Sequence, residues 1–265
     1  MSIPCIPSLY VKSKQEDSTK VALRLTKAKS PFVIRLTGGC GYMSDKDAED
    51  LYDLFAESLE GFNGAILFGG TRMVKKNNHQ EIVPGITEIV PIIRKNSLQI
   101  VTLGVVPKTN DLQISMELGM IVSNEPDSDY ITIIHPDQDT CLVIQLSCDC
   151  EVPWDAEYEE CLRIISSLRD YAGWNSLLIA YNGGGTTEKE ILATAKKNWP
   201  VLLIKESGRV SGKLANDKDF LKQYPSVYVA DKDADSIRAA LYKIRVPLNE
   251  VKPSYTIIKG GRVHG

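Results

Sequence analysis

Glycine-rich turns, each directly after an apolar run typical of a strand, are the residues best suited to chemistry in this chain. Glycine lacks Cβ, so its backbone approaches a ligand closely, and its N–H groups can surround an anion, above all where a helix begins. The four turns are Thr37-Gly38-Gly39-Cys40-Gly41, Gly69-Gly70-Thr71-Arg72, Asn182-Gly183-Gly184-Gly185-Thr186-Thr187 and Ser207-Gly208-Arg209. Because the strand ends of a parallel sheet share one edge, where open α/β folds bind ligands, the turns predict a site for a phosphate-bearing small molecule, in particular a nucleotide.

The third turn is the strongest of these signals. Its three glycines precede a predicted helix and form a candidate anion cradle, to which Thr186 and Thr187 add hydroxyl donors. In the alternative interpretation, Thr187 and Glu190 form a capping box that only starts the helix. A cap does not need three consecutive glycines, and each costs about 0.5–1 kcal/mol relative to alanine in regular structure. Ligand contact is therefore favoured, although both roles can hold at once.

Two of the turns also carry a cation, Arg72 in the second and Arg209 in the fourth. A guanidinium matches a phosphate with two parallel hydrogen bonds. The fourth turn is not a Walker loop, because Gly208 and Gly212 are four residues apart and Leu214 stands where Ser or Thr is required. It remains a candidate anion-binding turn, and a kinase or ATPase is disfavoured.

Composition and charge narrow the class of protein. Of the 265 residues, 43% are apolar and 25% charged, the usual balance of a globular protein, and the net charge of −3 lacks the basic excess of a nucleic-acid binder. No apolar run is long enough to span a bilayer, and the N-terminus does not read as a signal peptide. We therefore expect a cytoplasmic protein with no nucleic-acid or membrane partner, and homo-oligomerisation stays open.

Metal and acid–base signals are weak. The six cysteines are too few for a disulfide scaffold, and Cys148-Asp149-Cys150 lacks the second pair or nearby histidine of a zinc site. His135-Pro136-Asp137 has no further metal ligand at a standard spacing, so a structural role is favoured over catalysis. We expect no metal and no resident cofactor.

Alternating strand and helix patterns predict an α/β fold, a Rossmann-like parallel sheet with helices on both faces. The predicted domains are a loose lead-in over 1–20, one Rossmann-like domain over 21–250 and a tail over 251–265. The middle is less regular, and its apolar runs are compatible with a short antiparallel insertion or with added strands on the main sheet. Predicted strands cover 32–37, 65–68, 100–106, 176–181, 201–205 and 226–230, and the short apolar runs of the middle are 112–122, 130–135 and 141–146. One predicted helix is capped by Ser44, and another follows Pro84–Thr87 and continues to about Lys95. The other predicted helices cover 155–171, 187–198, 212–222 and 233–245.

Residues 181–216 resemble the ligand-sensing domain (LSDAT) at the N-terminus of TRPM-type cation channels, part of the SLOG superfamily. Gly183-Gly184 occupies the place of that family's two-glycine turn, and Ser207-Gly208-Arg209-Val210-Ser211 that of its Gly-Ser-Gly-Arg turn. The segment is similar, more distantly, to the Pro-Gly-Gly-x-Gly-Thr-x-x-Glu signature of LOG and lysine decarboxylase-like phosphoribohydrolases. There Asn182 replaces the proline and Thr186 the third glycine, whereas Thr187 and Glu190 match.

The resemblance covers roughly residues 30–230 and implies a fold that binds nucleotide-derived ligands of the ADP-ribose or cyclic-nucleotide type. We therefore predict a sensor that binds such a ligand through Gly38, Gly39, Gly69–Arg72, Gly183–Thr187 and Ser207–Arg209. The alternative is a nucleotide N-glycosidase, in which Glu190 would act at the ribosyl centre and Arg72 or Arg209 would hold the phosphate. The phosphoribohydrolases pair the motif glutamate with an upstream arginine, for which Arg72 is the candidate. A third alternative is a scaffold whose glycine turns serve packing only.

Overall fold

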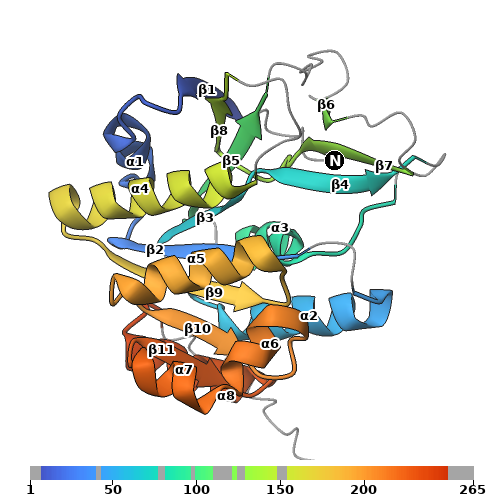
Figure 1. The fold of residues 1–265 in the computed structure, drawn as a ribbon, viewed down its shortest axis with the longest axis vertical. Helices are drawn as coiled ribbons and strands as arrows, with labels where there is room; N and C mark the ends of the chain where they lie inside the picture. Colours follow the sequence, from blue (N-terminus) through green and yellow to red (C-terminus); the bar gives the residue numbers. More distant parts are fainter. Residues whose placement is uncertain are drawn as a thin grey trace, which may run out of the picture.

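The computed structural model describes residues 7–39, 43–76, 81–96, 99–109, 121–123, 129–147 and 154–249. At its centre lies an eight-stranded sheet in which every neighbouring pair of strands is parallel (Figure 1). From edge to edge the strands are β1 (Ser8–Ser13), β8 (Thr140–Gln145), β5 (Val101–Lys108), β3 (Ala65–Gly69), β2 (Phe32–Gly38), β9 (Asn175–Tyr181), β10 (Val201–Ile204) and β11 (Val227–Ala230). The predicted fold class is confirmed.

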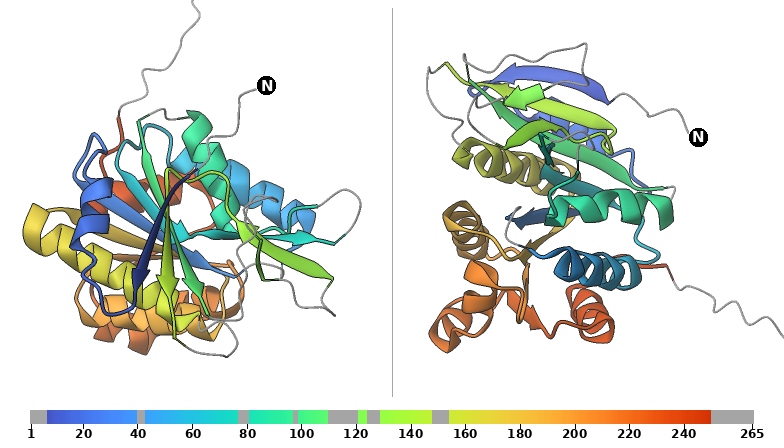
Figure 2. Two further views of the ribbon diagram at one scale, coloured as in Figure 1. Left: turned by 90° about the horizontal axis from the view of Figure 1, so that it is seen from above. Right: turned by 90° about the vertical axis from the view of Figure 1, so that its right-hand side faces the viewer.

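Helices cover both faces of the sheet, as the right-hand view of Figure 2 shows. One face packs against α2 (Asp45–Ser58), α3 (Ile89–Asn96) and α8 (Ala234–Ile244). The other packs against α1 (Thr19–Leu25), α4 (Asp155–Ala172), α5 (Gly185–Lys196), α6 (Arg209–Ala215) and α7 (Lys218–Gln223). This burial on both sides explains why the central strands read as continuous apolar runs rather than as alternating ones.

Strand β2 shows how the pleat assigns side chains to the two faces. Phe32, Ile34 and Leu36 join the core with α2 and α3, whereas Val33 joins the core with α1 and α4. Successive side chains point to opposite faces, so Arg35 lies on the same side as Val33 and reaches Glu190 of α5. The fold thereby places one charged side chain inside a buried strand.

The strand order reverses at β2. From β2 the chain continues to β3, β5 and β8 on one side, and to β9, β10 and β11 on the other. In open parallel sheets the crevice at such a reversal, outside the carboxyl ends of the strands, is the usual place for a ligand. The turns that follow β2, β3, β9 and β10 all leave the sheet at this edge.

A second sheet answers the open question about the middle of the chain. Strands β4 (Thr71–Lys75), β7 (Tyr130–Ile134) and β6 (Ile121–Ser123) form a three-stranded antiparallel sheet, while β8 joins the main sheet. Both alternatives are therefore realised in part. A short 3₁₀ helix, η1 (Ile86–Glu88), leads into α3.

Other boundaries follow the predicted elements closely. Ser44 caps α2 as expected, its side chain accepting a hydrogen bond from the Asp47 N–H. The helix expected over 212–222 is two helices, α6 and α7, separated by the Asp217 cap. Cys40 and Gly41, most of the run from 112 to 122, Cys148–Cys150 and the predicted tail lie outside the described residues.

The expected loose lead-in is wrong for residues 8–13, which form the edge strand β1. Polar composition misled the prediction, because β1 contains a lysine that is nevertheless 2% exposed. Lys12 Nζ lies 2.9 Å from Glu160 Oε1 of α4 and 3.1 Å from Ser18 Oγ. A buried ion pair of this kind is tolerated because both charges find partners.

Candidate functional site

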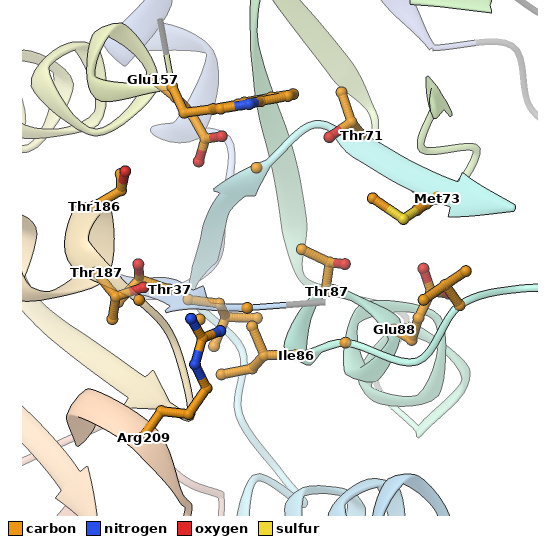
Figure 3. Close-up of a pocket in the computed structure, with 18 of the residues that line it drawn as sticks. Thr37, Thr71, Met73, Ile86, Thr87, Glu88, Glu157, Thr186, Thr187 and Arg209 are labelled. Carbon is orange, nitrogen blue, oxygen red and sulfur yellow. The ribbon is translucent and has the colours of Figure 1, made fainter. Parts of the chain in front are cut away.

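A cavity of about 360 Å³ opens at the edge of the sheet where the strand order reverses (Figure 3). We call it the edge cavity. One side is formed by Gly38 and Gly39 at the end of β2, by the start of α5 and by Arg209 at the start of α6. The opposite side is formed by β4 and η1, and Trp154 and Glu157 of the α4 region also line the cavity. We call the strands on either side of β2 the two arms of the sheet, one containing β3, β5 and β8 and the other β9, β10 and β11. Residues that follow strands of both arms line this one cavity.

Many of the predicted site residues come together here. Those that line the edge cavity are Gly38, Gly39, Gly69, Thr71, Gly184, Gly185, Thr186, Thr187 and Arg209. Those that do not line it are Gly70, Arg72, Gly183, Glu190, Ser207 and Gly208. The turns thus converge in space, although several of their residues support the cavity from behind rather than face it.

The start of α5 presents backbone N–H groups to the cavity. Gly184 is its N-cap, and no side chain caps it; the first N–H groups of a helix have no intrahelical partner. Asn182 and Gly183 both have positive φ, 59° and 86°, and a Cβ on Gly183 would collide with the side chain of Thr187. The capping-box alternative is not what the helix uses, because Glu190 bonds to Arg35 instead.

Arg35 is the central charged group of the site, and the sequence interpretation missed it. Its Nε and Nη2 donate to Glu190 at 2.8 and 3.2 Å, and Nη2 also donates to Glu157 at 2.8 Å. The residue is 2% exposed and lines the cavity. Its third nitrogen, Nη1, is buried without a hydrogen-bond partner among the described residues. A charged residue inside an otherwise apolar strand was the signal that could have revealed it.

Glu157 is a carboxylate of the cavity wall that contacts Arg35 directly. It lines the cavity and its side chain is 16% exposed. Burial raises its pKa above the usual value, and the nearby charge of Arg35 opposes that rise without cancelling it. The site thus contains a carboxyl that takes up a proton more readily than an ordinary glutamate.

Arg209 brings a second guanidinium to the same side of the cavity. A Cβ on Gly184 would lie 2.9 Å from its Nη2, and a Cβ on Gly39 would lie 3.2 Å from its Nη1. The absence of a side chain at both glycines therefore makes room for the guanidinium. Arg209 itself has a φ of 40° and follows Gly208 at 79°, a left-handed stretch that is costly for a residue with a side chain.

Arg72 lies behind the opposite wall rather than in the cavity. Its guanidinium forms two hydrogen bonds to Glu88, at 2.9 and 2.6 Å, and approaches Asp137 at 3.4 Å. Strand β4 holds it there, because Thr71–Lys75 pairs with β7 instead of forming a loop. The arginine that pairs with Glu190 is Arg35, so Arg72 does not have the place expected for a phosphoribohydrolase arginine. Glu88, which was not among the predicted site residues, lines the cavity instead.

His135 has a structural environment, as the sequence favoured. It is fully buried, packs edge-on against Phe68 at 5.2 Å and lies 3.3 Å from Glu88. Across the described ranges, no group of three His, Cys, Asp or Glu side chains is arranged to hold a metal ion. In the same part of the chain, no helix combines the length and apolarity needed to traverse a bilayer.

No protein-family model matches this sequence, and no curated protein matches it. Solved structures show a distant similarity. The molybdenum cofactor carrier protein of Chlamydomonas reinhardtii is 16% identical with a TM-score of 0.46, over 80% of this chain and 96% of that chain. The molybdenum cofactor binding protein of Rippkaea orientalis is 17% identical with a TM-score of 0.48, over 82% and 98%. A protein designated TM1055 is 13% identical with a TM-score of 0.47, over 80% and 98%.

Identities this low concern the fold alone. The narrower resemblance to the ligand-sensing domain of the channels stays a prediction.

Proposed function

We propose that this protein is a sensor that binds a nucleotide-derived small molecule in the edge cavity, with a phosphate at the Arg35 side. The observation that carries this proposal is Nη1 of Arg35, which has no hydrogen-bond partner among the residues that the structure describes, in a side chain that is 2% exposed and lines the cavity. An unsatisfied buried donor costs about 1–3 kcal/mol, and more when it is charged. A ligand oxygen that accepts a hydrogen bond from Nη1, after a small movement of the guanidinium toward the cavity, would remove that cost.

The groups around Nη1 suit a phosphate. The uncapped start of α5 supplies backbone N–H groups and a positive helix end, and Thr186 and Thr187 supply hydroxyl groups. Arg209 adds a full positive charge on the same side. Glu157 and Glu190 already offset the charge of Arg35, so the uncapped helix start is a further source of the positive potential that an anion needs.

The remainder of the cavity suits an organic ring. Met73, Val83 and Ile86 give it an apolar surface, and Trp154 lines its mouth as a half-exposed aromatic. The volume of about 360 Å³ falls within the range of about 300–1,000 Å³ common for small-molecule sites. A charged side and an apolar side joined in one cavity are the features of a site for a nucleoside or sugar phosphate.

The alternative, a nucleotide N-glycosidase using Glu190, has less support. Both carboxylate oxygens of Glu190 accept hydrogen bonds from Arg35, and Glu190 does not line the cavity. A general acid or base must come within hydrogen-bond reach of the atom it serves. Glu157 meets that condition better, since it lines the cavity and its pKa is raised.

Binding to AMP, CMP, NAD, ADP-ribose, cyclic AMP and inorganic phosphate, measured by calorimetry and thermal shift, tests the proposal. We expect at least one nucleotide to bind, and R209M to weaken it by about 10- to 100-fold, the loss of a hydrogen bond to a charged group. R35K, which keeps the charge but loses the planar fork, should also weaken binding. R24M is the matched control, because Arg24 does not line the cavity.

Free base is followed in the same samples. Release of base by the wild type and its loss in E157Q or E190Q would replace the sensor with a hydrolase. If neither phosphate nor any of the nucleotides binds, the proposal is wrong and the glycine turns serve packing.

A further inference from the structure

The wall of the edge cavity opposite Arg209 carries its own fixed carboxylate, Glu88. Figure 3 shows Glu88, Thr71 and Met73 across the cavity from Arg209, Thr186 and Thr187. Glu88 is 7% exposed and lies at the end of η1, next to the apolar surface of Met73, Val83 and Ile86. A carboxylate in such surroundings needs partners to remain there.

Those partners hold Glu88 from behind the wall. Arg72 donates to its two oxygens at 2.9 and 2.6 Å. The backbone N–H of Asp137 donates to His135 Nδ1 at 3.2 Å, which leaves Nε2 to carry the proton of a neutral imidazole. His135 Nε2 lies 3.3 Å from both Glu88 Oε1 and Arg72 Nη2. Neither Arg72 nor His135 lines the cavity.

These contacts keep Glu88 ionised. Burial opposes its charge, but hydrogen bonds from His135 and Arg72 hold its pKa below the usual value. An ionised carboxylate accepts hydrogen bonds and donates none, and it has about four acceptor positions. Arg72 and His135 account for three of them. Because Glu88 lines the cavity, the fourth is within reach of a donor that enters the cavity.

We propose that Glu88 is a specificity-determining residue that selects a nucleobase presenting an amino group over the matching base with an oxo group. This rests on the proposed function, which places the phosphate at Arg35 and the ring at the Met73 wall. An amino group donates to the open acceptor position of Glu88. An oxo oxygen in its place sets two buried acceptors against each other, and a buried polar group without a partner is costly.

The experiment compares two pairs of mononucleotides that differ by this one group, AMP with IMP and CMP with UMP. Calorimetry on the full chain should show the amino member of a pair binding about tenfold or more tightly, as expected when a site rejects a ligand lacking its donor. E88Q, whose amide can donate to an oxo group, should reduce that preference to near unity or invert it. D137N is the matched control, because Asp137 also touches Arg72 but does not line the cavity; it should keep the wild-type preference.

The outcomes distinguish a failure of the proposed role of Glu88 from a failure of the proposed function. Equal binding within both pairs by the wild type overturns the role of Glu88, whether or not E88Q folds, and leaves the proposed function intact. The same result follows if E88Q folds, as judged by its thermal transition, and keeps the amino preference. If no mononucleotide and no inorganic phosphate binds the wild type, the proposed function fails and the inference fails with it.

Discussion

A single cation inside a buried strand organises the candidate site. Arg35 lies between two carboxylates, Glu190 at 2.8 Å and Glu157 at 2.8 Å, and all three side chains are largely buried. Removing one partner of a buried ion pair costs about 3–5 kcal/mol, because the remaining charge stays desolvated. The arrangement therefore holds the guanidinium by two of its nitrogens, and Nη1 has no hydrogen-bond partner among the described residues.

Glu157 makes the stability of the protein depend on pH. Its pKa is raised above the ordinary value of 4.5 because it is buried. A carboxyl whose pKa is higher in the folded state binds its proton more tightly when folded, so the stability it favours is present at low pH and is lost as pH rises from 4.5 through the raised pKa. E157Q cannot ionise, and its free energy of unfolding should fall less over this range.

Urea unfolding at a series of pH values above 4.5 measures the difference. E159Q is the control, because Glu159 is on the same helix and pairs with Lys14 near the surface. The pKa of Glu88 is shifted the opposite way, so its effect lies at lower pH and does not overlap. Equal slopes for wild type and E157Q would show that Glu157 ionises normally in the folded state.

At the level of elements, the first turn of α5 decides whether the glycine-rich segment is a ligand site or a cap. The helix begins at Gly185, two residues earlier than the predicted start at Thr187, and Gly184 is its uncapped N-terminal residue. Gly183 turns the chain with a φ of 86° and leaves no room for a Cβ beside Thr187. The glycines therefore have separate tasks within one turn.

Two alanine substitutions separate these tasks. G183A should destabilise the protein by about 1–2 kcal/mol or more, the cost of a left-handed residue with a side chain, and should displace the start of α5 and weaken nucleotide binding. G185A should be neutral or stabilising, because an added Cβ meets nothing within 4 Å and alanine is the better helix former. Urea unfolding and calorimetry give both numbers. Similar losses of stability in both variants would contradict this division.

At the scale of the whole molecule, the edge cavity lies between the two arms of the main sheet. The cavity is lined by β4 and η1 from the arm that contains β3, and by α5 and Arg209 from the arm that contains β9 and β10. The two arms meet at the β2–β9 pair. A ligand that contacts both sides would connect them, whereas a ligand held by one side would not.

Hydrogen exchange tests this bridging. A saturating nucleotide should slow amide exchange both at the start of α5 and in the β4–η1 wall. At a hundredfold excess over Kd, the free energy of unfolding should rise by about 2.7 kcal/mol. Protection confined to the α5 side would show that the ligand does not reach Glu88, and protection at neither side would place it outside the edge cavity.

The sequence alone predicted those features that depend on neighbours along the chain, namely the glycine turns and the apolar periodicity of strands and helices. They indicated the parallel α/β class, most helices and strands, and the convergence of Gly38, Gly69, Gly184 and Arg209 on one edge. Only the tertiary structure showed that Arg35 and Glu88 line the cavity and that Arg72 does not. It also showed that Lys12 is buried in an edge strand. Each of these side chains pairs with a charge between 16 and 155 residues away, and partners at that separation are set by how strands and helices pack rather than by spacing along the chain.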